Sequence, residues 1–445
     1  MTRTLQTSAH VSSAALRSFE AQWRTRAADS LSPVREQAML RFLELGLPTT
    51  HDETWRYTNL RTLTGHSFID APRKTRGEIE PNASLSLLDA KERAATLLMV
   101  NGYPTLPGVD TILNGIEINT IRESSRLDPK FMRRYLEPLS DADQKRWVLL
   151  NTALFVDGLY LKITTQVATP LVILHVATGD GLDNVAYPRV IIEAAPGSKA
   201  TIIEHHVAQG EHTPLNNSNT LLALRQDSQL EHYRVYATGP GATHLDSLEI
   251  RQEQGSRCKQ FTIVLGGGLV RTGLEAHLGQ PGATLDSYSL LVGHEDRHVD
   301  CVNTVTHGAR DTHSSQTARA IASDASRVIF NSKVIVDAGA EHSQSQQSSR
   351  GLLLSPNAEI DTRPQLEIHA DEVKCAHGAT IGRLDPDMLF YMLSRGLDRD
   401  AAQSLLVYAF LADVLTDMSV ASARASIENA LITQLPDAQI LRKFR

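Results

Sequence analysis

Residues 326–336 read SRVIFNSKVIV, a run rich in β-branched side chains that follows the turn-forming Asp324 and precedes Gly339. Such residues favour strands, and the flanking residues favour tight turns. Similar short runs recur from about Asn151 onward, namely LYLKI, PLVILHV, RVIIEA, ATIIEHHV and QFTIVL. Helical periodicity is absent from this stretch, so we predict that it is mainly β.

The turn signals of this region recur at intervals close to multiples of about 14 residues. They fall at Gly197, Asp227, Gly255, Gly282, Asp324, Gly339, Asn357 and Asp371. A loose repeat without intervening helices favours a β-solenoid, in which each coil buries its alternating apolar positions against its neighbours. Hairpin-built β domains with unequal turns are the competing explanation. A solenoid also needs covers at its ends.

Both ends of the chain have helical patterns. At the N-terminal end, Val11–Ala28 has apolar residues at helical spacing, and Ser32 followed by Pro33 predicts an N-cap and N1 for a helix that ends at Gly46. The loop His51–Leu60 carries two large aromatics and is expected to dock the helical part onto the β region.

The C-terminal end predicts three helices. Asp385 and Pro386 form an N-cap and N1, Gly396 follows that helix, Asp398 opens a second helix, and a third spans Ala421–Leu435. We expect these helices to cap the last coil, with or without a docked partner. The domains expected are a mainly helical one at 1–150, a solenoid core at 151–383 and a helical one at 384–445.

Composition narrows the class of protein. The 445 residues are 41% hydrophobic and 21% charged, with a net charge of −7, which is typical of a soluble globular protein and gives no reason to expect nucleic-acid binding. No apolar run is long enough to span a membrane, and the N-terminus lacks the apolar core of a secretory signal. Three scattered cysteines indicate reduced thiols, so we expect a cytoplasmic protein; a transit peptide remains an alternative.

Three motifs suggest chemistry that their context does not support. HEDRH, His294–His298, matches a zinc-peptidase pattern, but that pattern needs a helix; on a strand its two histidines lie about 13 Å apart. GGGLVRTG, Gly266–Gly273, is read as a glycine turn and not as a phosphate loop. The third is a histidine-rich stretch that we interpret as an exposed polar edge; its members are Glu204, His205, His206, Glu211 and His212.

Cys375 and His377 differ, because at positions i and i+2 of a strand they lie on one face, about 6–7 Å apart at Cα. Two such side chains can share a metal or a cluster. The alternative is a small buried cysteine and a histidine hydrogen-bonded to backbone. Clusters and structural zinc usually take four protein ligands, so a metal site here must be completed by another chain.

The residues around this pair resemble a known family. Ser348–Leu397 reads SSRGLLLSPNAEIDTRPQLEIHADEVKCAHGATIGRLDPDMLFYMLSRGL and closely resembles the C-terminal signature of the SufB/SufD family, scaffold proteins of the SUF iron–sulfur assembly machinery. The upstream SRVIFNSKVIVDAGAEHSQSQQSSR and the N-terminal LPTTHDETWRYTNL also resemble it. The KCAHGAT context is more similar to the SufD branch than to the SufB branch.

The resemblance implies a right-handed parallel β-helix between helical domains. It also implies a non-catalytic scaffold that pairs with SufB and binds two copies of the ATPase SufC, which docks on the helices at about Asp385–Leu415. His377 matches a histidine implicated in nascent iron–sulfur cluster assembly at the SufB interface. Cys375 matches a secondary ligand, and SufB supplies the rest. A flavin accompanies some such complexes, but no residue here places one.

Two points lie outside this resemblance. Many members carry further histidines near the segment that here contains Arg297 and Cys301, so no role is carried onto it. The sequence also leaves open whether the isolated chain pairs with itself. The alternative class is a β-helix polysaccharide lyase or hydrolase, disfavoured by the missing secretion signal, by an aromatic content of only 5% and by the lack of a carboxylate groove.

Overall fold

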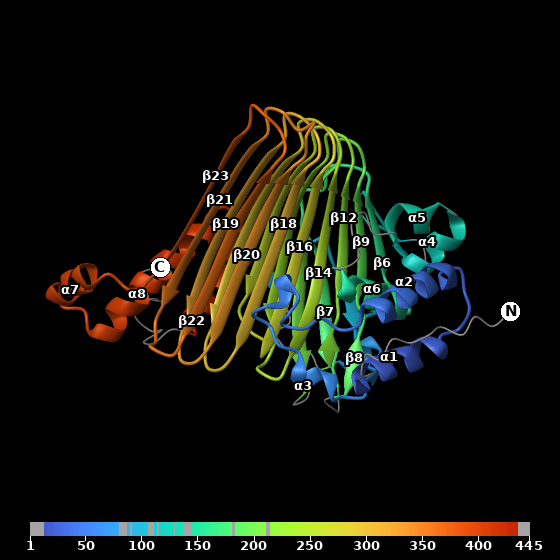
Figure 1. The fold of residues 1–445 in the computed structure, drawn as a ribbon, viewed down its shortest axis with the longest axis horizontal. Coiled ribbons are helices and arrows are strands. Elements are labelled where there is room, and N and C mark those ends of the chain that lie inside the picture. Colours follow the sequence, from blue (N-terminus) through green and yellow to red (C-terminus); the bar gives the residue numbers. More distant parts are fainter. Residues whose placement is uncertain are drawn as a thin grey trace.

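The protein is a parallel β-solenoid of about seven turns with helices at its two ends (Figure 1), as predicted. The computed structural model describes residues 13–79, 87–89, 91–105, 111–113, 115–128, 130–136, 145–179, 183–210 and 214–434. Among the helices of these residues, none is long and apolar enough to cross a membrane.

Two sheets form the walls of the solenoid, here called sheet A and sheet B. Sheet A runs in the order β22, β20, β18, β16, β14, β12, β9, β6, β5, β4, and sheet B in the order β23, β21, β19, β17, β15, β13, β10, β7, β2, β3. The strands of sheet A are β4 Thr111–Leu113, β5 Ile116–Thr120, β6 Leu159–Ile163, β9 Arg189–Ala194, β12 Asn219–Leu224, β14 Thr243–Gln252, β16 Leu269–Leu278, β18 His298–His307, β20 Arg327–Val336 and β22 Glu359–Ile368, with β1 Ile69–Asp70, β8 Asn184–Ala186 and β11 Leu215–Asn216 beside them. Those of sheet B are β2 Ala95–Val100, β3 Tyr103–Thr105, β7 Leu171–Thr178, β10 Lys199–Gln209, β13 Gln229–Ala237, β15 Arg257–Val264, β17 Thr284–Gly293, β19 His313–Ala322, β21 Gln344–Leu353 and β23 Lys374–Gly382.

The chain alternates between the two sheets, so one coil contains two strands and two turns. Register partners in neighbouring coils are about 26 to 32 residues apart, as for Gly273 beside Ser247 and Glu359 beside Arg327. The predicted interval of about 14 residues is therefore half a coil. Parallel pairing throughout the coils excludes the hairpin-built alternative, because hairpins make antiparallel pairs.

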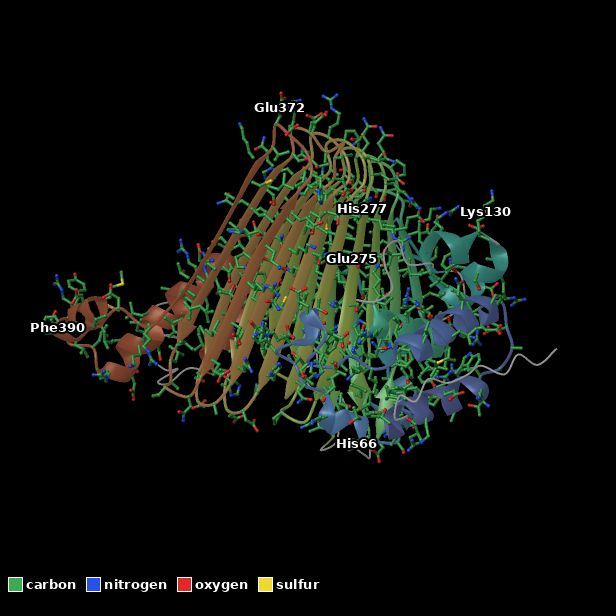
Figure 2. All side chains as sticks on the ribbon, viewed as in Figure 1. His66, Lys130, Glu275, His277, Glu372 and Phe390 are labelled. Atoms are coloured by element: carbon green, nitrogen blue, oxygen red, sulfur yellow. The ribbon has the colours of Figure 1, made fainter. Side chains whose placement is uncertain are left out.

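The turns that lead into sheet B stack along one rim of the solenoid. Each places a residue of left-handed conformation two positions before its strand: Gly197, Asp227, Gly255, Gly282, Asp311, His342 and Glu372. Backbone hydrogen bonds connect successive turns, as from His342 N–H to the Glu372 carbonyl at 3.1 Å. Figure 2 shows Glu372 at the upper end of this rim. Of the eight predicted turn residues, five are left-handed: Gly197, Asp227, Gly255, Gly282 and Asp324.

The N-terminal segment packs on the outer face of sheet A. Its apolar core contains Phe19, Phe42 and Trp147 together with the sheet residues Ile191 and Leu221. The helices of the segment are α1 Ala14–Arg24, α2 Ser32–Leu45, α3 Arg61–Thr64, α4 Ile121–Leu127, α5 Phe131–Tyr135 and α6 Arg146–Leu154, with the 3₁₀ turns η1 Glu53–Trp55 and η2 Arg76–Glu78. Strands β2 and β5 of the same segment extend both sheets, so residues 1–150 are less helical than their sequence pattern indicates.

The predicted N-terminal helices differ in their bounds: α1 ends at Arg24, four residues before the predicted Ala28, and Val11, the predicted start, lies outside the described residues. The N-cap of α2 is Leu31, so Ser32 is the first helical residue and not the cap; Pro33 lies in the first turn and Gly46 closes the helix, as expected. The docking role of the 51–60 loop is confirmed. Trp55 is buried, its ring lies 6.3 Å from that of Trp147, and Arg271 of sheet A lies over it with Cζ 3.8 Å from the ring centroid.

The C-terminal helices do not cap the last coil, contrary to our expectation. They are α7 Pro386–Ser394, α8 Arg399–Leu415 and α9 Ala421–Ile432, with Asp385 and Asp398 as the predicted N-caps and Gly396 after α7. Leu411 of α8 and Ile427 of α9 pack on Phe261 and Ile263, on the outer face of sheet B. The predicted end of α9, Leu435, lies outside the described residues. The apolar outer face of sheet B provided a better partner than the end of the coil stack, whose polar backbone edge offers little apolar surface.

Candidate functional site

Cys375 and His377 lie on β23, the last strand of sheet B. In the parallel ladder with β21, Cys375 is the partner of Ser345 and His377 is the partner of Gln347. Among the described strands, β23 pairs on this one side only, because it ends the sheet. Every residue of β23 except Cys375 is exposed, and Cys375 itself is half-buried. The pair therefore stands at the open end of the solenoid.

Both side chains face the interior of the solenoid. Cys375 packs against the apolar core between the two sheets, which contains Leu230, Cys258 and Leu285 from the same row of sheet B. Since alternate residues of a strand share a face, His377 faces the interior too. Its row continues inward as Gln347, Gln316, Ser287, Gln260 and His232. The predicted one-face arrangement of Cys375 and His377 is confirmed.

The two side chains offer one sulfur and one imidazole ligand. Burial raises the pKa of the Cys375 thiol above its usual value, against a smaller effect of the backbone hydrogen bond from Ser345, so the thiol is protonated at neutral pH. A metal ion must displace that proton. The other cysteines do not join the pair: Cys258 is four strands away along sheet B, about 19 Å, and Cys301 lies on sheet A. Among the described residues, Cys375 and His377 are therefore the two candidate ligands at this end of the solenoid.

A second exposed feature adjoins this end. Helix α7 has no buried residue, and three large apolar side chains project from it: Met388, Phe390 and Tyr391, which are 58%, 72% and 54% exposed. Figure 2 shows Phe390 on this helix, which projects beyond the sheets. Contiguous exposed apolar side chains on a soluble protein indicate an interaction surface.

The two motifs rejected from sequence have the expected local structure. His294 lies in a turn and His298 begins β18, so the HEDRH stretch is not helical and does not form the i, i+4 pair that zinc peptidases use. Residues 266–268 form the turn between β15 and β16, where Gly267 has a φ of 105°.

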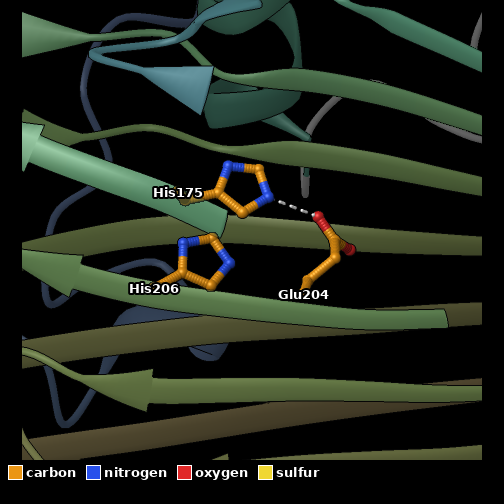
Figure 3. A group of neighbouring side chains, drawn as sticks. All are labelled: His175, Glu204 and His206. Carbon is orange, nitrogen blue, oxygen red and sulfur yellow. Dashed lines mark hydrogen bonds and ion pairs between the residues drawn. The ribbon is translucent and has the colours of Figure 1, made fainter. Parts of the chain in front are cut away.

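The interpretation of Glu204, His205 and His206 as an exposed polar edge is wrong. All three are buried on β10, with at most 2% exposure; Glu211 and His212 lie outside the described residues. Glu204 and His206 face the interior of the solenoid. Glu204 binds His175 Nε2 at 2.9 Å (Figure 3), and it also binds His232 Nε2 at 2.9 Å. Alternation along one strand could not reveal this cluster, because its partners come from other coils.

Comparison with known proteins agrees with this geometry. The profile of the SUF system FeS cluster assembly, SufBD core domain, matches residues 175–410, and that of the SufBD protein N-terminal region matches residues 15–173. The iron-sulfur cluster assembly protein SufD of Escherichia coli is 27% identical over 89% of this chain and 90% of its own. A SufBD family protein of Synechocystis is 27% identical over 87% of each chain, and SufD of Bacillus subtilis is 23% identical over 90% of this chain and 93% of its own. These matches favour iron–sulfur assembly over the polysaccharide-enzyme alternative. The chain belongs to the SufBD family of SUF-system iron–sulfur cluster assembly proteins.

Proposed function

We propose that this chain is a SufD-type scaffold, without catalytic activity of its own, on which a nascent iron–sulfur cluster is assembled as cargo. The observation that carries the proposal is the position of Cys375 and His377. They lie two residues apart on one face of a terminal strand, whose outer edge is unpaired among the described strands. Two ligands do not hold a cluster, so the remaining ligands come from a SufB-type partner.

The partner covers the open end of the solenoid. The exposed edge of β23 presents backbone groups that another strand can pair with. His377 is the more important ligand of the pair because it is exposed to the partner. Cys375 is the weaker one, because its proton must first be displaced. An isolated chain is expected to self-pair weakly through the same edge.

Substitution of His377 tests this role. His377→Ala in the reconstituted complex is expected to abolish or strongly reduce iron and sulfide content after anaerobic assembly, while complex formation persists. Thr380→Ala is the matched control, because Thr380 is exposed on the opposite face of the same strand. Normal cluster content in His377→Ala, or an equal loss in Thr380→Ala, would contradict the ligand role.

The SufC-type ATPase docks on the C-terminal helices, with α7 as its contact. Phe390→Glu is expected to lower ATPase binding at least tenfold, because it places a charge in the exposed apolar surface of α7. Leu127→Glu is the control: Leu127 is equally exposed, at 71%, but lies on α4 of the N-terminal segment. Binding measured by titration calorimetry that is unchanged in Phe390→Glu would exclude α7 as the contact.

The proposal places the complex in the cytoplasm. The three cysteines are free thiols, consistent with a reducing compartment. A flavin can accompany such a complex, but no residue of this chain places it.

A further inference from the structure

A polar cluster lies inside the first coils of the solenoid, far from Cys375 and His377. It joins the two sheets: His206 comes from β10 of sheet B, and His244 and Asp246 come from β14 of sheet A. All three are buried, with 1–3% exposure. Strand β10 lies six strand spacings from β23, or about 29 Å, so the cluster cannot share ligands with the terminal pair.

Each of the three side chains has one buried atom without a hydrogen-bond partner in the described part of the chain: His206 Nε2, His244 Nδ1 and Asp246 Oδ2. Leaving a buried polar atom unpaired destabilises the fold. His244 Nδ1 and Asp246 Oδ2 lie 3.4 Å apart without forming a hydrogen bond, and a ligand shared with His206 would satisfy these atoms together.

The remaining atoms of two of these side chains are fixed by other groups. Asp246 Oδ1 accepts a hydrogen bond from Ser218 N–H at 2.7 Å, and His244 Nε2 is 3.2 Å from Thr238 Oγ1. Metal-binding histidines and carboxylates are commonly oriented by hydrogen bonds of this kind through their other atom. The third side chain, His206, is held by stacking between His175 and Tyr236, at centroid distances of 4.3 and 4.8 Å.

The distances suit a small metal ion. One ligand atom from each of His206, His244 and Asp246 lies within 4.8 Å of the other two, and His244 Nδ1 is 3.4 Å from Asp246 Oδ2. Tetrahedral zinc with ligand bonds of about 2.0–2.2 Å separates its ligands by about 3.4 Å. Next to the rings, a cavity of about 10 Å³ is lined by His175, His206 and His244, enough for about one water as a fourth ligand.

The neighbouring group of His175, Glu204 and His206 is a poorer site. Both oxygens of Glu204 are already occupied, by His175, His232 and by Thr220 Oγ1 at 3.0 Å. In Figure 3 the carboxylate binds His175, whereas His206 lies stacked beneath that ring. Glu204 therefore supports the site without serving as a ligand.

We propose that His206, His244 and Asp246 form a buried site for a divalent transition-metal ion, best suited to Zn²⁺ with one water, that ties the two sheets together inside the first coils. Two imidazoles and one carboxylate are also a ligand set that Fe²⁺ accepts, so metal identity is part of the test. The site is independent of cluster assembly at the open end.

The test uses the full chain, purified from cells grown with added zinc and, separately, refolded with Zn²⁺ or Fe²⁺ alone. One equivalent of Zn²⁺ is expected to remain after gel filtration, and the midpoint of thermal unfolding is expected to rise with zinc. X-ray absorption at the zinc edge should show nitrogen and oxygen neighbours only. Absence of bound metal in the unmodified protein, or sulfur among the atoms bound to zinc, would overturn the proposal. A preference for Fe²⁺ would reject zinc and retain the site.

Variants then locate the ion. Asp246→Asn and His244→Gln are expected to lower zinc affinity at least tenfold, whereas the double variant Cys375→Ser/His377→Ala keeps one equivalent. His307→Gln is the matched control: His307 is also a buried interior histidine, but its two nitrogens are bonded to Thr312 and Ser314. Full zinc binding by folded Asp246→Asn, or loss in the double variant, would place the ion elsewhere.

Discussion

His377 stands directly beside Gln347 in the parallel ladder of the last two strands of sheet B, and the buried amide of Gln347 has no hydrogen-bond partner among the described residues. An amide in that position can orient the neighbouring imidazole once the imidazole binds a cluster. Its unpaired state is costly for the isolated chain. If His377 is a cluster ligand, as proposed, this relationship connects the stability of the terminal coil with cluster assembly.

Gln347→Met should separate these two effects. Removing the unpaired amide is expected to leave the free energy of unfolding unchanged or raise it by about 1 kcal/mol, while cluster loading falls about tenfold. Chemical denaturation and anaerobic iron analysis measure the two quantities. Gln344→Met, on the exposed face of the same strand, should change neither. Normal loading in Gln347→Met would show that the amide does not orient His377.

The reactivity of Cys375 should depend on pH in a way that reports its surroundings. Because burial raises the pKa of its thiol, the rate of alkylation should reach half its maximum above about pH 8.5, the value of a free cysteine. Burial raises the pKa of Cys301 to about 12 and also protects Cys258, so neither should react in the folded protein. Mass spectrometry after iodoacetamide treatment resolves the three sites. A midpoint at or below pH 8.5 would contradict the predicted environment.

Arg271 should be essential for docking the N-terminal loop. Its guanidinium lies over Trp55, bonds to the Thr54 carbonyl at 2.7 Å and forms an ion pair with the buried Asp300. Arg271→Ala leaves Asp300 as an unpaired buried charge and is expected to cost about 3–5 kcal/mol. Urea denaturation measures the loss.

The control for this substitution is Arg327→Ala. Arg327 also lies near an aromatic ring of the loop, with Cζ 5.4 Å from the Tyr57 centroid, but its ion pairs are at the surface. Its loss should cost at most about 1 kcal/mol. If the two substitutions lower the free energy of unfolding equally, burial of the Arg271–Asp300 ion pair is not the cause of the loss.

Glu193 should make stability depend on pH. Burial raises the pKa of its carboxyl, but hydrogen bonds from Tyr135 and Tyr160 and the charge of Arg225 outweigh it, so the pKa is lowered overall. A carboxyl with a lowered pKa stabilises the fold above its unfolded value of about 4.3, and this contribution is lost as the pH falls through the folded pKa. Glu193→Gln should therefore cost about 1–3 kcal/mol at pH 7 and less near pH 4.

Denaturation at both pH values checks this prediction. Glu341→Gln, in an exposed turn, should stay within about 0.5 kcal/mol of the unmodified protein at each pH. A cost for Glu193→Gln that is equal at pH 7 and pH 4 would mean that the carboxylate charge is not what stabilises the fold.

The residues at the turns made the solenoid predictable. The turns that were not predicted are those whose residues gave no turn signal in the sequence. The glycines at 197, 255 and 282 marked left-handed turn positions, because glycine adopts that conformation without strain. Between Gly282 and Asp324 the sequence showed no turn, yet Glu295 and Asp311 occupy left-handed positions there. Glutamate rarely adopts this conformation, so Glu295 gave no turn signal, and Asp311 N–H is held by a hydrogen bond to the Glu341 carbonyl of the next coil at 3.0 Å.

The candidate site was predictable in part. Spacing alone placed Cys375 and His377 on one face, but the position of that face, at an uncovered end, depends on where α7–α9 pack. The His206, His244 and Asp246 cluster could not be predicted, because its residues belong to two sheets and approach only when the coil closes. Pairings across coils are set by register, which a single strand does not encode.

The uncovered terminal coil should open locally more often than the rest of the solenoid. In a stack of repeats each coil is stabilised by its neighbours, and β22 and β23 have a described neighbour on one side only. Amide hydrogens of these strands should therefore exchange with solvent faster than those of β16 or β17, through local opening that spares the rest of the stack. A chain that covers the end would slow this exchange by completing the coil. The folding of the last coil and the binding of a partner are then coupled. The protection of the β23 amides from exchange therefore measures the fraction of chains that have a partner bound.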